Sequence, residues 1–257
     1  MKRLSSGFLK VYRPFALALS VSLLAISPVN AEVLSSSKLA KEEQAFNKHA
    51  INLISKPQQG FLTCVECHGI LGRSKQSALS QKQVPKLAGQ DMGYLYDQLI
   101  NFKLGRRYTI EMSGILASYS DQELQTIAHY YAGQPLLTPP NLDVTQDALK
   151  HTQLEDDTWA KLGESLYLKG DEMRGIQACQ TCHGVYGEGR IIGLDKAPKL
   201  TGQHARYVRM TLENFAKGKR TTDGLFDQPM QTISRKLNDK DRRNLAAYIQ
   251  RLSLPKQ

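Results

Sequence analysis

Two short stretches of this chain share one pattern, Cys64-Val-Glu-Cys67-His68-Gly69 and Cys179-Gln-Thr-Cys182-His183-Gly184. Each contains Cys-x-x-Cys-His, which is typical of covalent haem attachment. The two thiols of such a motif can add to the two vinyl groups of one haem, and the adjacent histidine is then placed to bind the iron. All four cysteines of the chain lie in these two stretches. The sequence therefore predicts two covalently bound haem c groups.

Three other uses of paired cysteines remain open from the motifs alone. A thioredoxin-like redox pair would occur once, at the start of a helix after a strand. A zinc site would need the pairs close together or followed by spaced histidines, whereas these pairs are more than 100 residues apart. Structural disulfides are also compatible with an exported protein. The duplication, with His-Gly after each pair, favours haem.

The N-terminus has the features of a secretory signal peptide. A basic start is followed by an apolar run of thirteen residues from Phe15 to Ser27, and Val29-Asn30-Ala31 offers small residues for cleavage. The run is short for a membrane span, which needs about 20 residues. We expect residues 1–31 to be a signal peptide cleaved after Ala31 and the protein to be periplasmic, with an uncleaved anchor as the alternative.

The chain is basic, with 34 Lys and Arg against 24 Asp and Glu and a net charge of +10. Four of the basic residues lie in the predicted signal peptide, which leaves about +6 for the rest of the chain. Positive and negative residues are interspersed, so the excess fits docking and solubility better than nucleic-acid binding. No nucleic-acid partner is expected.

Both haem motifs lie inside a repeated frame. Pro85-Lys-Leu-Ala-Gly-Gln90 matches Pro198-Lys-Leu-Thr-Gly-Gln203 at an offset of 113 residues, and a tyrosine and an Asn-Phe…Gly…Arg stretch follow at the same offset. From the late methionine onward the offset is 118, so the length change falls in the preceding loop. The chain is thus a duplicated unit of about 100 residues.

The repeat predicts the domain organisation. We expect a first domain over 32–134, a Pro-rich linker over 135–144 and a second domain over 145–257. Each unit is predicted to be helical, with one helix before the haem motif, a middle helix and a closing helix. The first closing helix should begin at Ser120, which forms a capping-box pattern with Glu123, and Asn238 should cap its counterpart.

The residue on the other face of each iron decides between a carrier and a catalyst, because a permanent ligand blocks substrate. Met112 and Met230 are the only methionines that match each other, each eight residues before the cap of the closing helix. We expect both in loops that fold across a haem and ligate its iron. A second histidine on one haem is the alternative, although the remaining histidines do not align as a pair (His49, His129, His151 and His204).

With these residues in view, the chain resembles the di-haem cytochrome c4 family over about residues 41–252. The resemblance implies an all-α fold of two tandem class I cytochrome c domains related by pseudo-twofold symmetry. It implies iron ligation by His68 with Met112 and by His183 with Met230. One departure is the apolar Ile70-Leu71 after the first motif, which we expect to alter only the haem edge.

The resemblance also implies residues that support the haems. The carbonyls of Pro85 and Pro198 are expected to accept the N–H of the proximal imidazoles, which fixes the ring and raises its basicity.

Two further matched pairs surround the expected sites. Tyr94 and Tyr207 either hydrogen-bond to haem propionates or fill the core. Arg107 and Arg220 either pair with propionates, for which guanidinium geometry is suited, or are solvated.

In function the resemblance implies a periplasmic electron carrier and not an enzyme. The expected partners are redox proteins, with a donor such as a quinol-oxidising complex and an acceptor such as a haem–copper terminal oxidase. Peripheral membrane association is left open. The alternatives are a di-haem peroxidase and a dedicated electron-transfer subunit of a periplasmic dehydrogenase or oxidase.

Overall fold

A computed structural model describes residues 36–57, 60–74, 84–136, 157–192, 195–222 and 228–255. The predicted signal peptide and the linker from residue 137 onward lie outside these residues, so the domain bounds stay predictions. Among the described residues, no helix is both long enough and apolar enough to cross a membrane.

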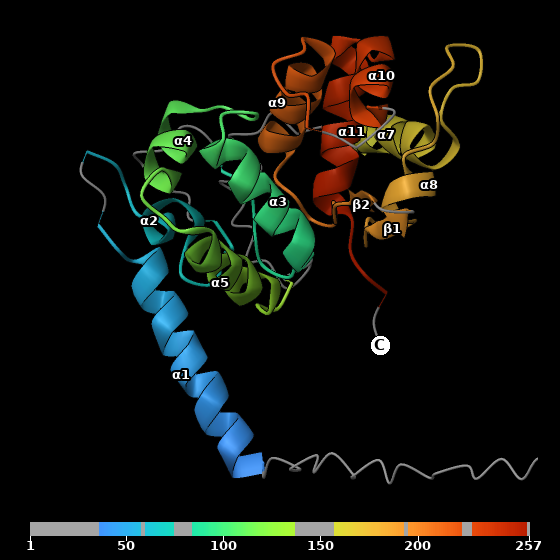
Figure 1. The fold of residues 1–257 in the computed structure, drawn as a ribbon. Helices are drawn as coiled ribbons and strands as arrows, with labels where there is room; N and C mark the ends of the chain where they lie inside the picture. The colour runs from blue at the N-terminus through green and yellow to red at the C-terminus, as the bar shows by residue number, and fades with distance from the viewer. Residues whose placement is uncertain are drawn as a thin grey trace, which may run out of the picture.

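The described chain forms two helical halves that lie side by side (Figure 1). The first half contains α1 (Ser36–Ile54), α2 (Cys64–His68), α3 (Met92–Lys103), α4 (Ile110–Leu116) and α5 (Asp121–Ala132). The second half contains α7 (Asp157–Lys169), α8 (Gln180–His183), α9 (Ala205–Ala216), α10 (Pro229–Lys236) and α11 (Asp239–Arg251). The order of helices is the same in both halves, and this confirms the predicted fold of two tandem helical domains.

One short β-hairpin departs from the all-α expectation. Strands β1 (Arg190–Ile192) and β2 (Asp195–Ala197) pair antiparallel, with Arg190 opposite Ala197. Strands of three residues are too short to produce a visible alternation of apolar and polar residues, which explains why the sequence did not indicate them.

The closing helices begin where the capping patterns predict. The Ser120 hydroxyl accepts the Glu123 N–H at 3.2 Å, and the Glu123 carboxylate accepts the Ser120 N–H at 2.7 Å. Asn238 and Asp241 form the same reciprocal pair before α11, at 2.9 Å in both directions. Each box satisfies two backbone donors that a helix start leaves open.

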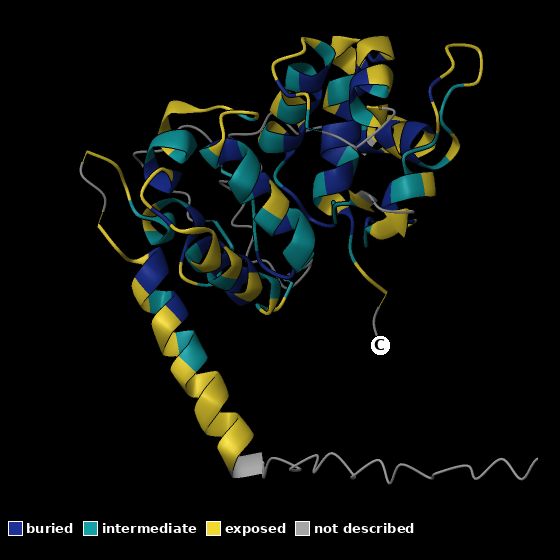
Figure 2. Cartoon of the chain, in the orientation of Figure 1, coloured by how far each residue is buried: buried dark blue, intermediate teal, exposed yellow. Residues whose placement is uncertain are grey.

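Each half has its own apolar core, built largely on its closing helix. In α5 the inward face is buried throughout (Leu124, Ile127, Ala128 and Tyr131). In α11 the matching face is also buried at Leu245 and Ile249, and the C-cap residue Leu252 continues it. Tyr248 is partly buried against the same core. Figure 2 shows these inner faces in dark blue, whereas α1 is exposed over its first half.

The two halves meet about a pseudo-twofold axis. Arg107 and Arg220, which occupy the same place in the repeat, form an isolated antiparallel bridge with each other. A residue that pairs with its own repeat counterpart must lie close to the axis that relates the two copies.

Candidate haem-binding sites

Each haem motif ends in a short helix whose last residue is the motif's histidine, and Cys179 lies just before α8 as its N-cap. Thr63 caps α2, and its side chain and that of Glu66 form a capping box across the first turn. The chain then turns sharply at Gly69, with φ 76° and ψ 158°, and at Gly184, with φ 82° and ψ 159°. Only glycine adopts such angles without strain, so the glycine after each histidine is a backbone requirement.

Both histidines are buried and hydrogen-bonded to the predicted carbonyls. His68 and His183 are each 6% exposed. The Nδ1 of His68 lies 3.0 Å from the Pro85 carbonyl oxygen, and that of His183 lies 2.9 Å from the Pro198 oxygen. In each ring Nδ1 therefore carries the proton, and Nε2 has no hydrogen bond to a described residue.

Burial lowers the pKa of both imidazoles, although the carbonyl hydrogen bond partly opposes this shift. Both rings are accordingly neutral near pH 7. A neutral ring that presents Nε2 is the form that binds iron.

The four thiols are unpaired, and the two Cys pairs lie in different halves of the fold. Burial raises the pKa of Cys64 to about 11 and that of Cys179 to about 12. Such thiols are neutral near pH 7. No group of three or more His, Cys, Asp or Glu side chains that could hold a metal ion is assembled among the described residues.

Met112 and Met230 lie in short helices and not in the loops that the sequence predicted. The Thr109 hydroxyl accepts the Met112 N–H at 3.1 Å and so begins α4, while Pro229 supplies the first residue of α10. These local signals favour a turn of helix around each methionine.

Each methionine packs on the core that also contacts its own haem motif. Met112 and Cys64 both pack against the buried cluster of the first half, and Met230 and Cys179 against that of the second. Burial raises the pKa of Cys67, and the charges of Glu66 and Glu111 raise it further. The contribution of Glu111 places the start of α4 near the motif. Met92 also packs on the first cluster, but the residue that matches it is Ala205.

The predicted tyrosines and arginines meet at the contact between the halves. Arg107 donates to the Tyr207 hydroxyl at 3.0 Å, and Arg220 donates to the Tyr94 hydroxyl at 3.0 Å. Both guanidinium groups also donate to the Gln98 side-chain oxygen, at 2.8 and 2.9 Å. No pattern in the sequence indicates that Gln98 belongs to this cluster.

This cluster has positive charge without a carboxylate. Arg220 is only 6% exposed, its Nε has no hydrogen-bond partner, and no described Asp or Glu pairs with it. Burial raises the pKa of Tyr207, but the charges of Arg107 and Arg220 outweigh burial and bring it down to about 8. A buried cation without a counter-ion is costly, so these donors fit an anionic group such as a haem propionate.

Two tyrosines support the motifs without having been predicted. Tyr131 donates to the Gly69 carbonyl at 3.3 Å, and Tyr167 donates to the Gly184 carbonyl at 2.7 Å. These tyrosines do not occupy matching positions in the repeat, so the alignment of the two halves could not reveal them.

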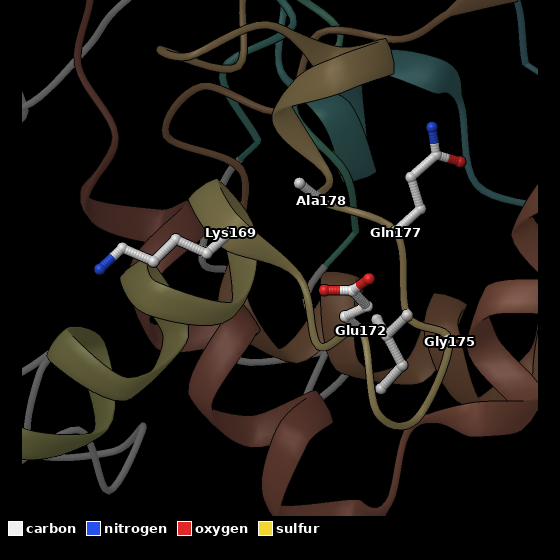
Figure 3. A pocket seen from close by; sticks show the side chains of 6 residues that line it. Lys169, Glu172, Gly175, Gln177 and Ala178 are labelled. Carbon is white, nitrogen blue, oxygen red and sulfur yellow. The ribbon is translucent and has the colours of Figure 1, made fainter.

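A surface hollow of about 420 Å³ lies just before the second motif, and Figure 3 shows its lining side chains. Lys169 and Gln177 point away from each other there, and Ala178 lies at the edge next to Cys179. Its lining shows no arrangement of acid, base and nucleophile.

Known proteins resemble this chain over most of its length. The family model for cytochrome c matches residues 160–253. Cytochrome c4 of Pseudomonas aeruginosa is 37% identical over 207 residues, covering 79% of this chain and 90% of that protein. The thiosulfate dehydrogenase electron acceptor of Thiomonas intermedia is 31% identical over 187 residues, covering 73% of this chain and 77% of that protein. The crystal structure of reduced recombinant cytochrome c4 from Pseudomonas stutzeri matches with a TM-score of 0.62 and 36% identity, covering 74% and 93% of the two chains.

Proposed function

Because this chain belongs to the cytochrome c4 family, we propose that it carries electrons in the periplasm between redox protein partners, through two irons that are each ligated by a histidine and a methionine. The protein is a di-haem c-type cytochrome with two covalently bound haem c groups. The observation that carries the proposal is the repeated geometry of a buried, neutral imidazole held by a proline carbonyl. When bound, each haem supplies one-electron exchange at its iron.

The residues of this chain have distinct proposed roles at each haem. Cys64 and Cys67 would hold the first haem through thioethers, and His68 and Met112 would ligate its iron. The second haem has the corresponding set (Cys179, Cys182, His183 and Met230). Thioether sulfur is a soft ligand that favours ferrous iron and so raises the potential.

The groups around the ligands keep each site fixed during electron exchange. Pro85 and Pro198 hold the proton on the Nδ1 of each ring and thereby its orientation. Arg107 and Arg220 are proposed to neutralise propionates at the contact between the halves, with Tyr94 and Tyr207 as neighbouring hydrogen-bonding groups. If each iron keeps its histidine and its methionine in both oxidation states, electron exchange would need little rearrangement of these residues.

The proposed route places a quinol-oxidising complex upstream and a haem–copper terminal oxidase downstream, with transient contacts to both. A second candidate is a dedicated electron acceptor of a dehydrogenase. It is favoured by the similarity to proteins named thiosulfate dehydrogenase electron acceptor from Thiomonas intermedia and Stutzerimonas stutzeri. Stable co-purification with a dehydrogenase would favour this candidate over a free carrier.

The N-terminal sequence supports the proposed periplasmic location. We propose that residues 1–31 direct export and are removed after Ala31. The N-terminal residue of the purified protein, read by mass spectrometry, tests this cleavage.

Haem stoichiometry and the ferric absorption spectrum test the function directly. Two covalent haems with the weak near-infrared band of methionine-to-iron ligation at full strength are expected. A band that is halved or missing would mean that one iron has another ligand or an open face. In that case the peroxidase alternative would take precedence, and peroxide turnover would be the next assay.

A further inference from the structure

The repeated Pro-Lys-Leu-x-Gly-Gln segments hold the two halves together through reciprocal hydrogen bonds. The side-chain oxygen of Gln203 accepts the Lys86 backbone N–H at 2.9 Å, and its Nε2 donates to the Lys86 carbonyl at 3.0 Å. Gln90 makes the same two bonds to Lys199, at 2.9 and 3.0 Å. Both glutamines are only 8% exposed, so these bonds are sheltered from water.

The peptide group that each glutamine contacts also holds a histidine. The Lys86 N–H belongs to the same peptide group as the Pro85 carbonyl, which accepts the Nδ1–H of His68 at 3.0 Å. In the second half, the Lys199 N–H and the Pro198 carbonyl form one peptide group, which holds His183 at 2.9 Å. Each ring is therefore joined to the opposite half of the molecule through a single peptide plane.

A peptide plane transmits polarisation from one end to the other. Resonance couples the nitrogen and the oxygen, so an acceptor on the N–H increases the negative charge on the carbonyl oxygen. Hydrogen bonds in such chains strengthen one another in a protein interior. A more negative oxygen takes more of the imidazole proton, which makes the ring a more basic ligand. A more basic ligand stabilises ferric iron and lowers the potential.

We propose that Gln203 tunes the haem of the first half and Gln90 tunes the haem of the second, each across the contact between the halves. Both are positioning residues, because they act on iron only through a proline–lysine peptide and a histidine. The inference rests on the proposed ligation of the irons by His68 and His183. It makes the two potentials depend on whether the halves are in contact.

The test uses the full-length holoprotein with Gln203→Leu or Gln90→Leu. In histidines labelled with ¹⁵N, the Nδ1–H resonance of the reduced protein reports the hydrogen bond to the proline carbonyl. Gln203→Leu is expected to move the His68 resonance upfield and raise the potential of the first haem, with little change at His183. Gln90→Leu is expected to give the reverse pattern. General loosening of the contact does not produce such a crossed pattern.

Gln98→Leu is the matched control, because Gln98 lies at the same contact but bonds to Arg107 and Arg220 and not to either lysine peptide. It should leave both Nδ1–H resonances in place. The proposal is overturned if each Leu variant shifts mainly the histidine of its own half, or if Gln98→Leu shifts both histidines equally.

Gln203→Glu covers the case in which the Leu variant does not assemble with two haems. A carboxylate keeps an acceptor on the Lys86 N–H and is a stronger one, so the His68 resonance should move downfield. An unchanged resonance would again overturn the proposal. Failure of the proposed function is distinct from these outcomes, because it would appear in the unmodified protein as an iron without a histidine and a methionine ligand.

Discussion

In each half a tyrosine donates a hydrogen bond to the buried glycine carbonyl that follows the motif's histidine, but the tyrosine comes from a different helix in the two halves. In the first half the Gly69 carbonyl accepts a hydrogen bond from Tyr131 of the closing helix α5. In the second half the Gly184 carbonyl accepts one from Tyr167 of the opening helix α7. Both carbonyls follow a proposed haem ligand directly, at a turn that only glycine allows.

The matching positions show that the two side chains have changed places. The repeat counterpart of Tyr167 is Ile54, and the counterpart of Tyr131 is Ile249. All four residues are buried. Each half therefore contains one tyrosine and one isoleucine at these two positions. Both halves keep a hydrogen bond to the glycine carbonyl, but the position that donates it differs.

The opening helices differ in a second way. In α7 a Cβ on Gly163 would collide with the backbone of Asn244 in α11, so the two helices approach very closely. The counterpart in α1 is Ala50, which is fully buried, whereas the first half of α1 is exposed. The second half thus has the tighter packing between its opening and closing helices.

Replacing each proposed methionine ligand should have the largest effect and should affect one half at a time. Met112→Ala or Met230→Ala is expected to convert one haem to high-spin or altered ligation, halve the near-infrared band and lower the potential of that haem, because the soft ligand is lost. Ferric spectra and potentiometric titration measure these changes. Spectra unchanged in both variants would show that the ligand assignment is wrong.

Removing one hydroxyl should destabilise the second half more than the first. Tyr167→Phe leaves the Gly184 carbonyl buried without its donor, at a cost of about 1–3 kcal/mol. Tyr131→Phe should cost less, since its hydrogen bond is longer, 3.3 against 2.7 Å. Thermal unfolding of the holoprotein measures both, with the half-exposed Tyr186→Phe as the control. A larger loss for Tyr131→Phe would contradict the comparison.

Exchanging Tyr131 and Ile54 in the first half should restore the stability that replacing Tyr131 alone removes. Tyr131→Ile is expected to lower the stability by about 1–3 kcal/mol through the unsatisfied carbonyl. Adding Ile54→Tyr supplies the hydroxyl from the helix that provides it in the second half, and so should recover most of the loss. Residues in contact are coupled in this way, and a double-mutant cycle measures the coupling. If the stability losses of the two replacements simply add, the exchange of tyrosine and isoleucine between the halves does not reflect a shared hydrogen-bonding role.

Raising the pH should give the smallest change in stability, and the group responsible should be Lys86 of the first Pro-Lys-Leu-x-Gly-Gln segment. Burial lowers the pKa of Lys86 from 10.5 to about 8. Between these pH values the unfolded chain keeps a proton that the folded chain releases, so stability should rise with pH and be flat below pH 8. The full difference in pKa would be worth about 3 kcal/mol, and because Lys86 is only partly buried a rise of about 1 kcal/mol is expected. Lys86→Met should show a smaller rise than the unmodified protein in denaturant unfolding, because the lowered pKa of Tyr207 contributes a rise over the same pH range in both proteins. Parallel pH curves for both proteins would contradict it.

The fold is predictable from the sequence where the signal is local or repeated. The capping boxes at Ser120 and Asn238 predicted the starts of α5 and α11, and the repeated motifs predicted two helical haem domains. The helices that contain Met112 and Met230 were not predicted, because Thr109 and Pro229 are weak start signals when taken alone.

Residues that act across the two halves were the hardest to identify. The Pro-Lys-Leu-x-Gly-Gln repeat was visible, but its glutamines bond to residues more than 100 positions away. Gln98 has no counterpart that makes the same bonds, and the exchange of tyrosine with isoleucine removes the repeat signal. A single sequence contains no information on such distant partners.

The reciprocal bonds between Lys86 and Gln203, and between Lys199 and Gln90, have the form of an interface between two identical subunits. In such an interface every contact occurs twice, and each surface fits a copy of itself. The molecule can thus be regarded as a homodimer whose subunits share one chain, which gives the second subunit a high effective concentration.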